Sequence, residues 1–221
     1  MEDDQTLPAQ VGQNTVSYVP YNYAMHGHGP FDSLASIENI NYEQEIKEKD
    51  GILIYVFIEP HIARAIGSMK TMSWKADDVY YEQTKEGKLL RKGTFRKQRR
   101  FLTPLYIFLN KSRILKALRI DFPLKFNASH FSLTADVIKA MKEKFQLQYP
   151  HGEFYLMIFP GSLYSKEMIE EFKKRKIDYL DYTHLYPADD PRYVIAPQDE
   201  HPSPLGFQFI AKKLISDLGL K

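Results

Sequence analysis

The sequence predicts an α/β fold with a mostly parallel sheet. Three continuous runs of β-branched and aromatic residues, at 51–58, 154–159 and 177–182, have the composition of buried strands. Apolar residues at helical spacing lie between these runs, and strands that alternate with helices form βα units. With 221 residues, the chain is long enough for one domain with a substantial core.

The first third of the chain begins with a short expected strand, Val19–Ala24, which ends in the glycine-containing loop 26–30. A helix is expected from Phe31 to about Lys47, because its apolar residues keep mostly helical spacing. Asp32 or Ser33 is available as its N-cap. The strand at 51–58 then ends at Pro60, which has no N–H to continue an inner strand.

The central region is less regular. Residues 80–101 resemble a hairpin that turns near Glu86-Gly87, and a helix is expected around 105–118. Further on, Thr134 can cap a helix that runs to about Gln146, and 165–176 forms a charged amphipathic helix.

The expected topology indicates where a site would lie. Ligands of parallel α/β sheets bind beyond the carboxyl ends of the strands. The loops 25–30 and 59–61 follow expected strands, and the segment Asp199-Glu200-His201 is expected at the same edge.

Composition narrows the chemistry. Cysteine is absent, which excludes disulfides, thiolate metal sites and a cysteine nucleophile. The longest apolar run, 51–58, is far shorter than the roughly 20 residues of a membrane-spanning helix. The acidic start, residues 1–5, does not resemble a signal peptide. The sequence therefore leaves the localisation undecided.

The charge is distributed unevenly. Residues 85–125 contain thirteen Lys and Arg against two acidic residues, a local net charge of +11 in a chain of net charge +2, so the remainder carries −9. Such a basic segment either faces an anionic partner, such as a membrane surface, an acidic polysaccharide or nucleic acid, or is an ordinary solvated face.

The strongest candidate for catalysis is His201. It precedes Pro202, which favours an extended backbone, and Ser203-Pro204, which have the residue types of an N-cap and a first helical position. Asp199 lies two residues upstream, where a carboxylate can hold the imidazole in one tautomer. The pair has the chemistry of a general base and its orienting acid, although a histidine that merely precedes a capped helix fits equally well.

Two loops offer candidate substrate contacts. Gly27 and Gly29 allow the backbone to approach a ligand and present its N–H groups, as in an oxyanion site, or they simply form a tight turn. His61 could donate a hydrogen bond to an acyl oxygen or pair structurally with Glu59. Arg64, one helical turn further, could bind an anion or lie on the surface.

Four blocks resemble, in this order, those of the SGNH (GDSL-like) hydrolase family. They are Thr6-Leu7-Pro8, the stretch 21–30 (YNYAMHGHGP), the strand 54–58 with His61 and Arg64, and the stretch 199–206 (DEHPSPLG). The similarity covers most of the chain apart from the basic segment, and the last block is the most specific.

This resemblance implies a flavodoxin-like three-layer α/β/α fold and hydrolysis of ester bonds by a Ser-His-Asp mechanism without a cofactor or metal. Asp199 and His201 match the acid and the base, and Gly27 matches an oxyanion donor. The family's Asn in the third block is absent, and His61 is the nearest polar replacement. The substrate would be an ester-bearing small molecule, a lipid or an acylated carbohydrate, and nucleic acid is not an expected partner.

The family's first block, a strand followed by a Gly-Asp-Ser turn, has no counterpart in the chain. We therefore expect a single SGNH-like domain over 1–221 that lacks its first strand and its serine, with a basic hairpin and helix inserted at about 80–125. A non-catalytic carbohydrate- or lipid-binding relative is the main alternative. A metal-dependent hydrolase that uses His26, His28, His61 and Asp199 is the weaker one.

Overall fold

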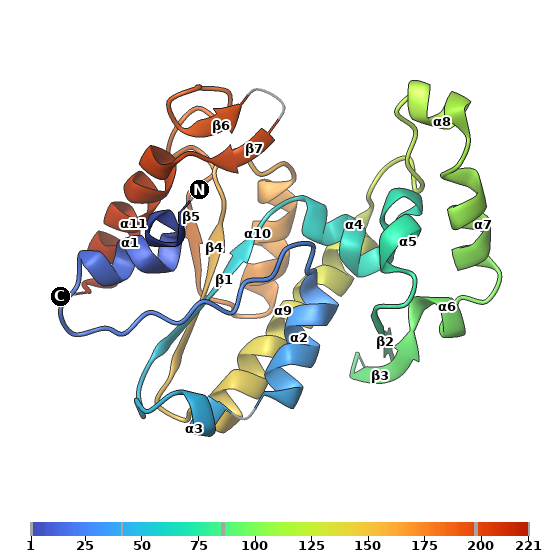
Figure 1. Ribbon diagram of the computed structural model, residues 1–221. Helices are drawn as coiled ribbons and strands as arrows, with labels where there is room; N and C mark the ends of the chain where they lie inside the picture. Colours follow the sequence, from blue (N-terminus) through green and yellow to red (C-terminus); the bar gives the residue numbers. More distant parts are fainter. Residues whose placement is uncertain (1, 41, 85–86, 197–198, 221) are drawn as a thin grey trace. The chain divides into compact units, whose positions relative to one another are not determined.

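The computed structural model describes residues 2–40, 42–84, 87–196 and 199–220 and confirms a mixed α/β protein with a mostly parallel sheet. The chain divides into two compact units. One comprises residues 1–26, 159–161 and 181–221, and the other comprises residues 27–158 and 162–180. Figure 1 labels the helices and strands.

The larger unit contains a three-stranded sheet in the order β1-β4-β5. Strand β1 (Ile52–Phe57) pairs in parallel with β4 (Glu153–Ile158), with Tyr55 opposite Leu156 and Phe57 opposite Ile158. Strand β5 (Tyr179–Asp181) completes the sheet on the other side of β4 and ends at the boundary between the units. Strands β1 and β5 lie within the runs at 51–58 and 177–182, and β4 is shifted by one residue from the run at 154–159, so the three predicted strands are confirmed.

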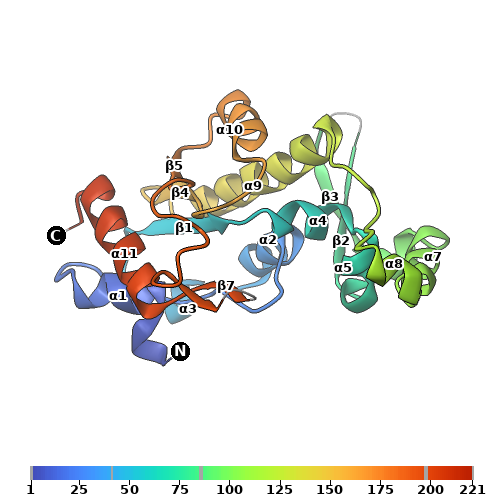
Figure 2. The ribbon, with the colours of Figure 1, turned by 90° about the horizontal axis from the view of Figure 1, so that it is seen from above.

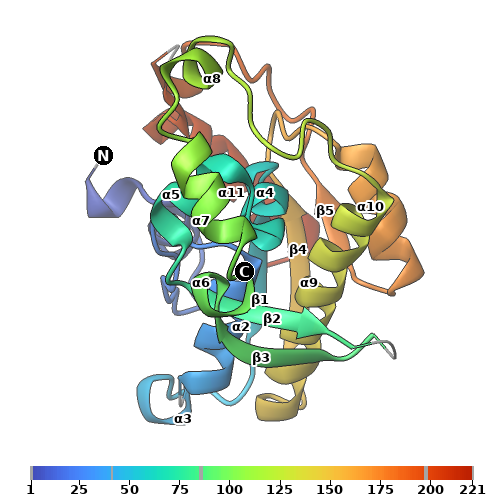
Figure 3. The ribbon, with the colours of Figure 1, turned by 90° about the vertical axis from the view of Figure 1, so that its right-hand side faces the viewer.

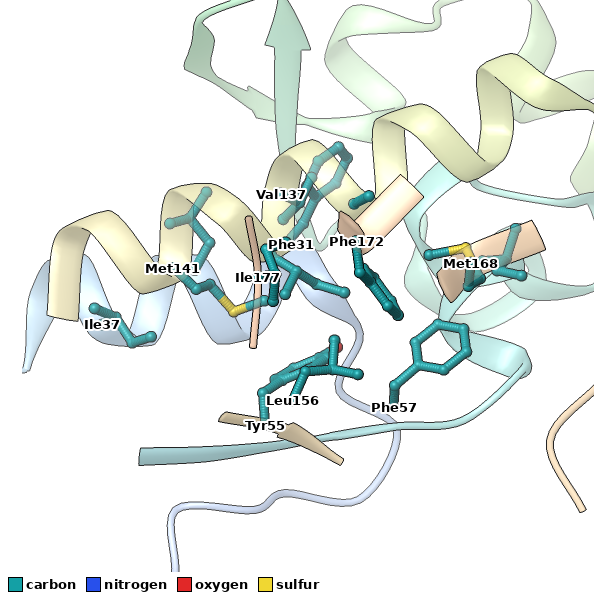
Figure 4. Close-up of a cluster of buried hydrophobic side chains, with 14 of the residues drawn as sticks. Phe31, Ile37, Tyr55, Phe57, Val137, Met141, Leu156, Met168, Phe172 and Ile177 are labelled. Atoms are coloured by element: carbon teal, nitrogen blue, oxygen red, sulfur yellow. The ribbon is translucent and has the colours of Figure 1, made fainter. Parts of the chain in front are cut away.

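One face of this sheet forms the core. Helices α2 (Pro30–Asn39), α9 (Ala128–Gln148) and α10 (Ser165–Lys174) contribute apolar side chains that pack on alternate residues of β1 and β4 (Figure 4). Helix α9 runs alongside the sheet (Figure 1, Figure 2). Phe57, Leu156 and Phe172 are completely buried, and burial of side chains of this size stabilises a fold by about 1.5–3 kcal/mol each.

In its described residues, the larger unit also contains α3, which precedes β1, and seven elements that follow β1 along the chain. They are α3 (Tyr42–Glu45), α4 (Pro60–Ile66), α5 (Met69–Lys75), β2 (Val79–Gln83), β3 (Leu89–Thr94), α6 (Phe95–Gln98), α7 (Leu102–Leu109) and α8 (Arg113–Ala117). Strands β2 and β3 form an antiparallel pair, which confirms the predicted hairpin. Part of its predicted turn, Glu86, lies outside the described residues.

The smaller unit contains the two ends of the chain. It comprises the short 3-10 helix η1 (Asp3–Gln5), α1 (Leu7–Gln13), β6 (Val194–Ala196), β7 (Asp199–Pro202) and α11 (Pro204–Leu218). Helix α1 packs on α11, and β6 pairs antiparallel with β7.

Four predicted elements were wrong in extent or type, three of them outside residues 31–47. Val19–Ala24 is not a strand, because no described segment pairs with it and a strand requires a neighbour for its N–H and C=O groups. The helix expected over 105–118 is two helices, α7 and α8, with Ser112 capping the second through the Leu115 N–H. The helix that Thr134 was expected to cap is α9, which Asn127 caps seven residues earlier, and the Thr134 hydroxyl donates to the His130 carbonyl instead.

The helix expected over 31–47 is also divided. Helix α2 ends at Asn39 and α3 begins at Tyr42. Gly29 is the N-cap of α2, and the Asp32 carboxylate accepts the Gly29 N–H from the third helical position. Asp32 therefore closes a capping box rather than serving as the cap itself.

Candidate functional site

Asp199 and His201 lie on strand β7 and not in the loop that the sequence suggested. Strand β7 pairs with β6, with Val194 opposite Pro202 and Ala196 opposite Asp199. The register shifts between these two pairs, so that residues 199 to 202 of β7 oppose residues 194 to 196 of β6 and the ladder is irregular beside His201. His201 is exposed.

The end of β7 is firmly attached to the start of α11. The Ser203 N–H donates to the Tyr193 carbonyl at 2.8 Å, and the Ser203 hydroxyl donates to the Arg192 carbonyl at 2.6 Å. The same hydroxyl accepts the Gly206 N–H, which confirms Ser203 as N-cap. A Cβ on Gly206 would lie 2.5 Å from the Tyr193 carbonyl oxygen, so this close approach requires glycine. These contacts fix the backbone two residues after His201.

Residues 27–29, which we call the Gly27 loop, lie in the larger unit and are fixed from several sides. Gly27 has φ = +77°, a conformation that favours glycine, and a Cβ there would meet the Trp74 ring at 3.0 Å. Arg64 Nη1 donates to the His28 carbonyl at 2.8 Å, and the Gly29 N–H donates to Asp32 at 2.7 Å. The ends of α2, α4 and α5 thus hold this loop together.

One backbone donor of the loop is unused by the protein. Within the described ranges, the Gly27 N–H forms no hydrogen bond, whereas the His28 N–H closes the turn over residues 26–27 and that of Gly29 is taken by Asp32. Gly27 is half-buried. A fixed loop with an unused N–H group has the chemistry of an anion- or oxyanion-binding site.

A buried ion pair lies beneath this loop. The Lys75 side chain is 3% exposed, and its Nζ donates to Asp32 at 2.7 Å, to Asp78 and, more weakly, to the Gly27 carbonyl at 3.4 Å. Trp74 packs between cations, with its ring 5.2 Å from Lys75 Nζ and 5.9 Å from the Arg64 guanidinium. Sequence reasoning missed Lys75, because nothing local to residue 75 indicates a partner 43 residues away.

His61 is the second residue of helix α4 and is hydrogen-bonded to the phenol of Tyr55, with 2.9 Å between the hydroxyl and Nδ1. Burial, with the nearby charges of Arg64 and Lys75, lowers the pKa of His61 to about 3. Burial also raises the pKa of Tyr55 well above its usual value. Both groups are therefore neutral at ordinary pH, and a neutral imidazole keeps one N–H to donate. Its predicted contact with an acyl oxygen stays a prediction.

Arg64 interacts with both candidate site positions of the larger unit, the Gly27 loop and His61. Its guanidinium contacts the Gly27 loop through the His28 carbonyl, and its charge contributes to the low pKa of His61. Gly27 and His61 thus share one polar region, whereas Asp199 and His201 belong to the smaller unit.

The larger unit also has a pocket of about 510 Å³ that contains none of the predicted site residues. It is bounded by β2, α7 and the start of α9, with Tyr80, Arg99, Tyr106 and His130 among its lining residues. The Arg99 guanidinium is occupied by the carbonyls of Ile66 and Gly67, at 2.8 and 2.9 Å. The pocket therefore combines tyrosine rings with polar side chains such as Glu82, Gln83 and His130.

Among the described residues, no three His, Asp or Glu side chains lie close enough to hold a metal ion. No family profile, curated protein sequence or solved structure matches this chain.

Proposed function

We propose that this chain is an SGNH-type esterase or acyl-group hydrolase. In this proposal His201 is the general base, Asp199 orients it, and the Gly27 N–H stabilises the oxyanion. The nucleophile is a serine that precedes residue 1, as the family resemblance implies. The sheet β1-β4-β5 would form part of a flavodoxin-like α/β/α arrangement.

The observation that carries the proposal is the Gly27 loop. Oxyanion stabilisation needs donors that are already in place before charge develops, since reorganisation costs free energy. The Arg64, Asp32 and Lys75 contacts fix this loop, and the Gly27 N–H has no acceptor within the described protein. The resemblance assigned the oxyanion role to this same glycine.

The chemistry follows from these roles. The serine Oγ attacks the ester carbonyl while His201 takes its proton, and the negative carbonyl oxygen accepts the Gly27 N–H. His201 then gives the proton to the leaving alcohol. A water molecule, activated by the same imidazole, releases the acid from the acyl-serine.

Activity tests this proposal directly. The 221-residue chain should hydrolyse p-nitrophenyl acetate no faster than its His201→Ala variant. The chain extended by the residues that its gene encodes upstream should show turnover, and His201→Ala in that longer chain should lower kcat by about 10³-fold or more. His184→Ala, which removes another exposed histidine of the smaller unit, is the matched control.

Two results would count against it. An upstream sequence that carries no serine, or an extended chain that is folded but inactive, would favour the non-catalytic carbohydrate- or lipid-binding alternative. Hydrolysis by the 221-residue chain that disappears in His201→Ala would place the nucleophile within residues 1–221.

A further inference from the structure

An exposed apolar surface covers α7 and α8 in the larger unit. Helix α7 contains no charged side chain, yet Phe108 on it is 72% exposed, and Phe101, which precedes it, is 92% exposed. Ile114 and Leu118 on and after α8 are 72% and 64% exposed. We call residues 101–118 the apolar helix pair.

The exposed residues of α7 occupy a defined face. Phe101, Leu105 and Phe108 follow the i, i+4, i+7 spacing that places residues on one side of a helix. The opposite side faces the protein, because Thr103 is buried and Ile107 packs against the core. Helix α7 contacts α5, and both α7 and α8 lie outward from it within this unit (Figure 1, Figure 3).

The cations around this surface are unpaired. Within the described chain, none of a group of five forms an ion pair: Lys111, Arg113, Lys116, Arg119 and Lys125. The nearby acid, Asp121, is occupied, since its carboxylate accepts from Ser68 and from the Lys70 N–H. The positive charge of the segment is therefore available to an external anion.

We infer that the apolar helix pair and these five cations form a docking surface for a bilayer of anionic phospholipid. Exposed Phe, Leu and Ile side chains gain free energy in the acyl boundary, and neighbouring Lys and Arg are attracted to anionic headgroups. Nucleic acid or an acidic polysaccharide would satisfy the cations but would leave Phe101, Phe108 and Ile114 in water. A lipid surface accounts for both features.

Docking of this kind takes place at the boundary between the lipid bilayer and water. In the described part of the chain, no helix is long and apolar enough to cross a membrane. Helix α7 would lie along the surface with its Phe101–Leu105–Phe108 face in the lipid. For the proposed hydrolase, such docking would favour a lipid or membrane-bound acylated substrate, a consequence that rests on the proposed function.

Vesicle co-sedimentation of the intact chain tests the docking surface. Binding should be strong to phosphatidylcholine vesicles in which about a third of the lipid is phosphatidylglycerol, and weak to pure phosphatidylcholine. Phe101→Ser/Phe108→Ser should lower the partition coefficient at least about tenfold. Leu147→Ser/Leu163→Ser removes two exposed apolar side chains elsewhere in the same unit and should leave binding unchanged.

The cationic part is tested separately. Lys111→Gln/Arg113→Gln/Lys116→Gln should lower binding to the anionic vesicles by about 10- to 100-fold. Lys144→Gln/Lys166→Gln/Lys173→Gln removes the same charge from exposed positions on α9 and α10 and should have at most a small effect. Added salt should weaken binding of the unmodified chain.

Insertion into the bilayer can be followed by fluorescence. Because the chain contains no cysteine, a single introduced cysteine can be labelled at one chosen position. An environment-sensitive fluorophore on Phe108→Cys should shift to shorter wavelength with anionic vesicles, and one on Leu147→Cys should not. Equal loss of binding in both cation triples, or no shift at position 108, would overturn the inference. So would duplex DNA binding without lipid binding, or self-association that buries residue 108 in the absence of lipid. None of these tests requires hydrolysis, so failure of docking and failure of the proposed function are distinguishable.

Discussion

Replacing Lys75 with methionine is expected to lower the free energy of unfolding by about 3–5 kcal/mol, because the change leaves a buried carboxylate without its partner. The Asp32 side chain is 11% exposed and loses its only ion pair in the described structure. The same substitution releases the Gly27 carbonyl, so the loop should also become less rigid. Urea denaturation followed by far-UV circular dichroism measures the effect.

A double variant identifies the cause. Asp32→Asn retains an oxygen that can accept the Gly29 N–H but removes the charge. Lys75→Met/Asp32→Asn should therefore be at least about 1 kcal/mol more stable than Lys75→Met alone. Lys142→Met is the matched control, since Lys142 pairs with Asp178, which is 67% exposed, and its loss should cost about 0–1 kcal/mol. Equal losses for Lys75→Met and Lys142→Met would contradict the buried-pair interpretation.

Acidification is expected to destabilise the protein through His61. Its pKa is lowered to about 3 in the folded protein, against 6.5 ordinarily, so between these values the unfolded chain binds a proton that the folded chain does not. The stability contribution is complete above about pH 6.5 and is lost as the pH falls toward 3. The loss from His61 alone should reach about 2–3 kcal/mol between pH 7 and pH 4.5.

The comparison is with His61→Asn, whose amide can replace Nδ1 as partner of Tyr55 but does not titrate. Unfolding free energies measured against pH should fall less steeply for this variant than for the unmodified chain. His151→Asn, at an exposed position of the same unit, should keep the full slope. Parallel curves for the unmodified chain and His61→Asn would show that His61 is not held neutral.

Local sequence patterns predicted much of the fold. The strands β1, β4 and β5 were identified from continuous apolar runs, and α10 from its helical periodicity. The cap of α11 was identified because Ser203-Pro204 satisfies the first N–H groups of a helix within a few residues. In each case the deciding interactions lie within one segment.

The candidate site was predictable to a smaller extent. Gly27 and His61 were identified by position, but their setting depends on Arg64, Lys75 and Tyr55, which local sequence does not connect to them. The low pKa of His61 arises from burial and from charges on other elements. Neither this burial nor these charges can be recognised from the residues next to His61 in the sequence.

The sequence by itself determined the α/β class, the main strands, the basic segment and the glycine that the Gly27 turn requires. Only the tertiary structure decided that Val19–Ala24 has no strand partner among the described residues, that Asp199 and His201 lie on a short strand, and that Lys75 is buried against Asp32. The physical reason is the sequence separation of the interacting residues. Periodicity and capping involve residues a few positions apart, whereas strand pairing, burial and ion pairs join residues that only folding brings together.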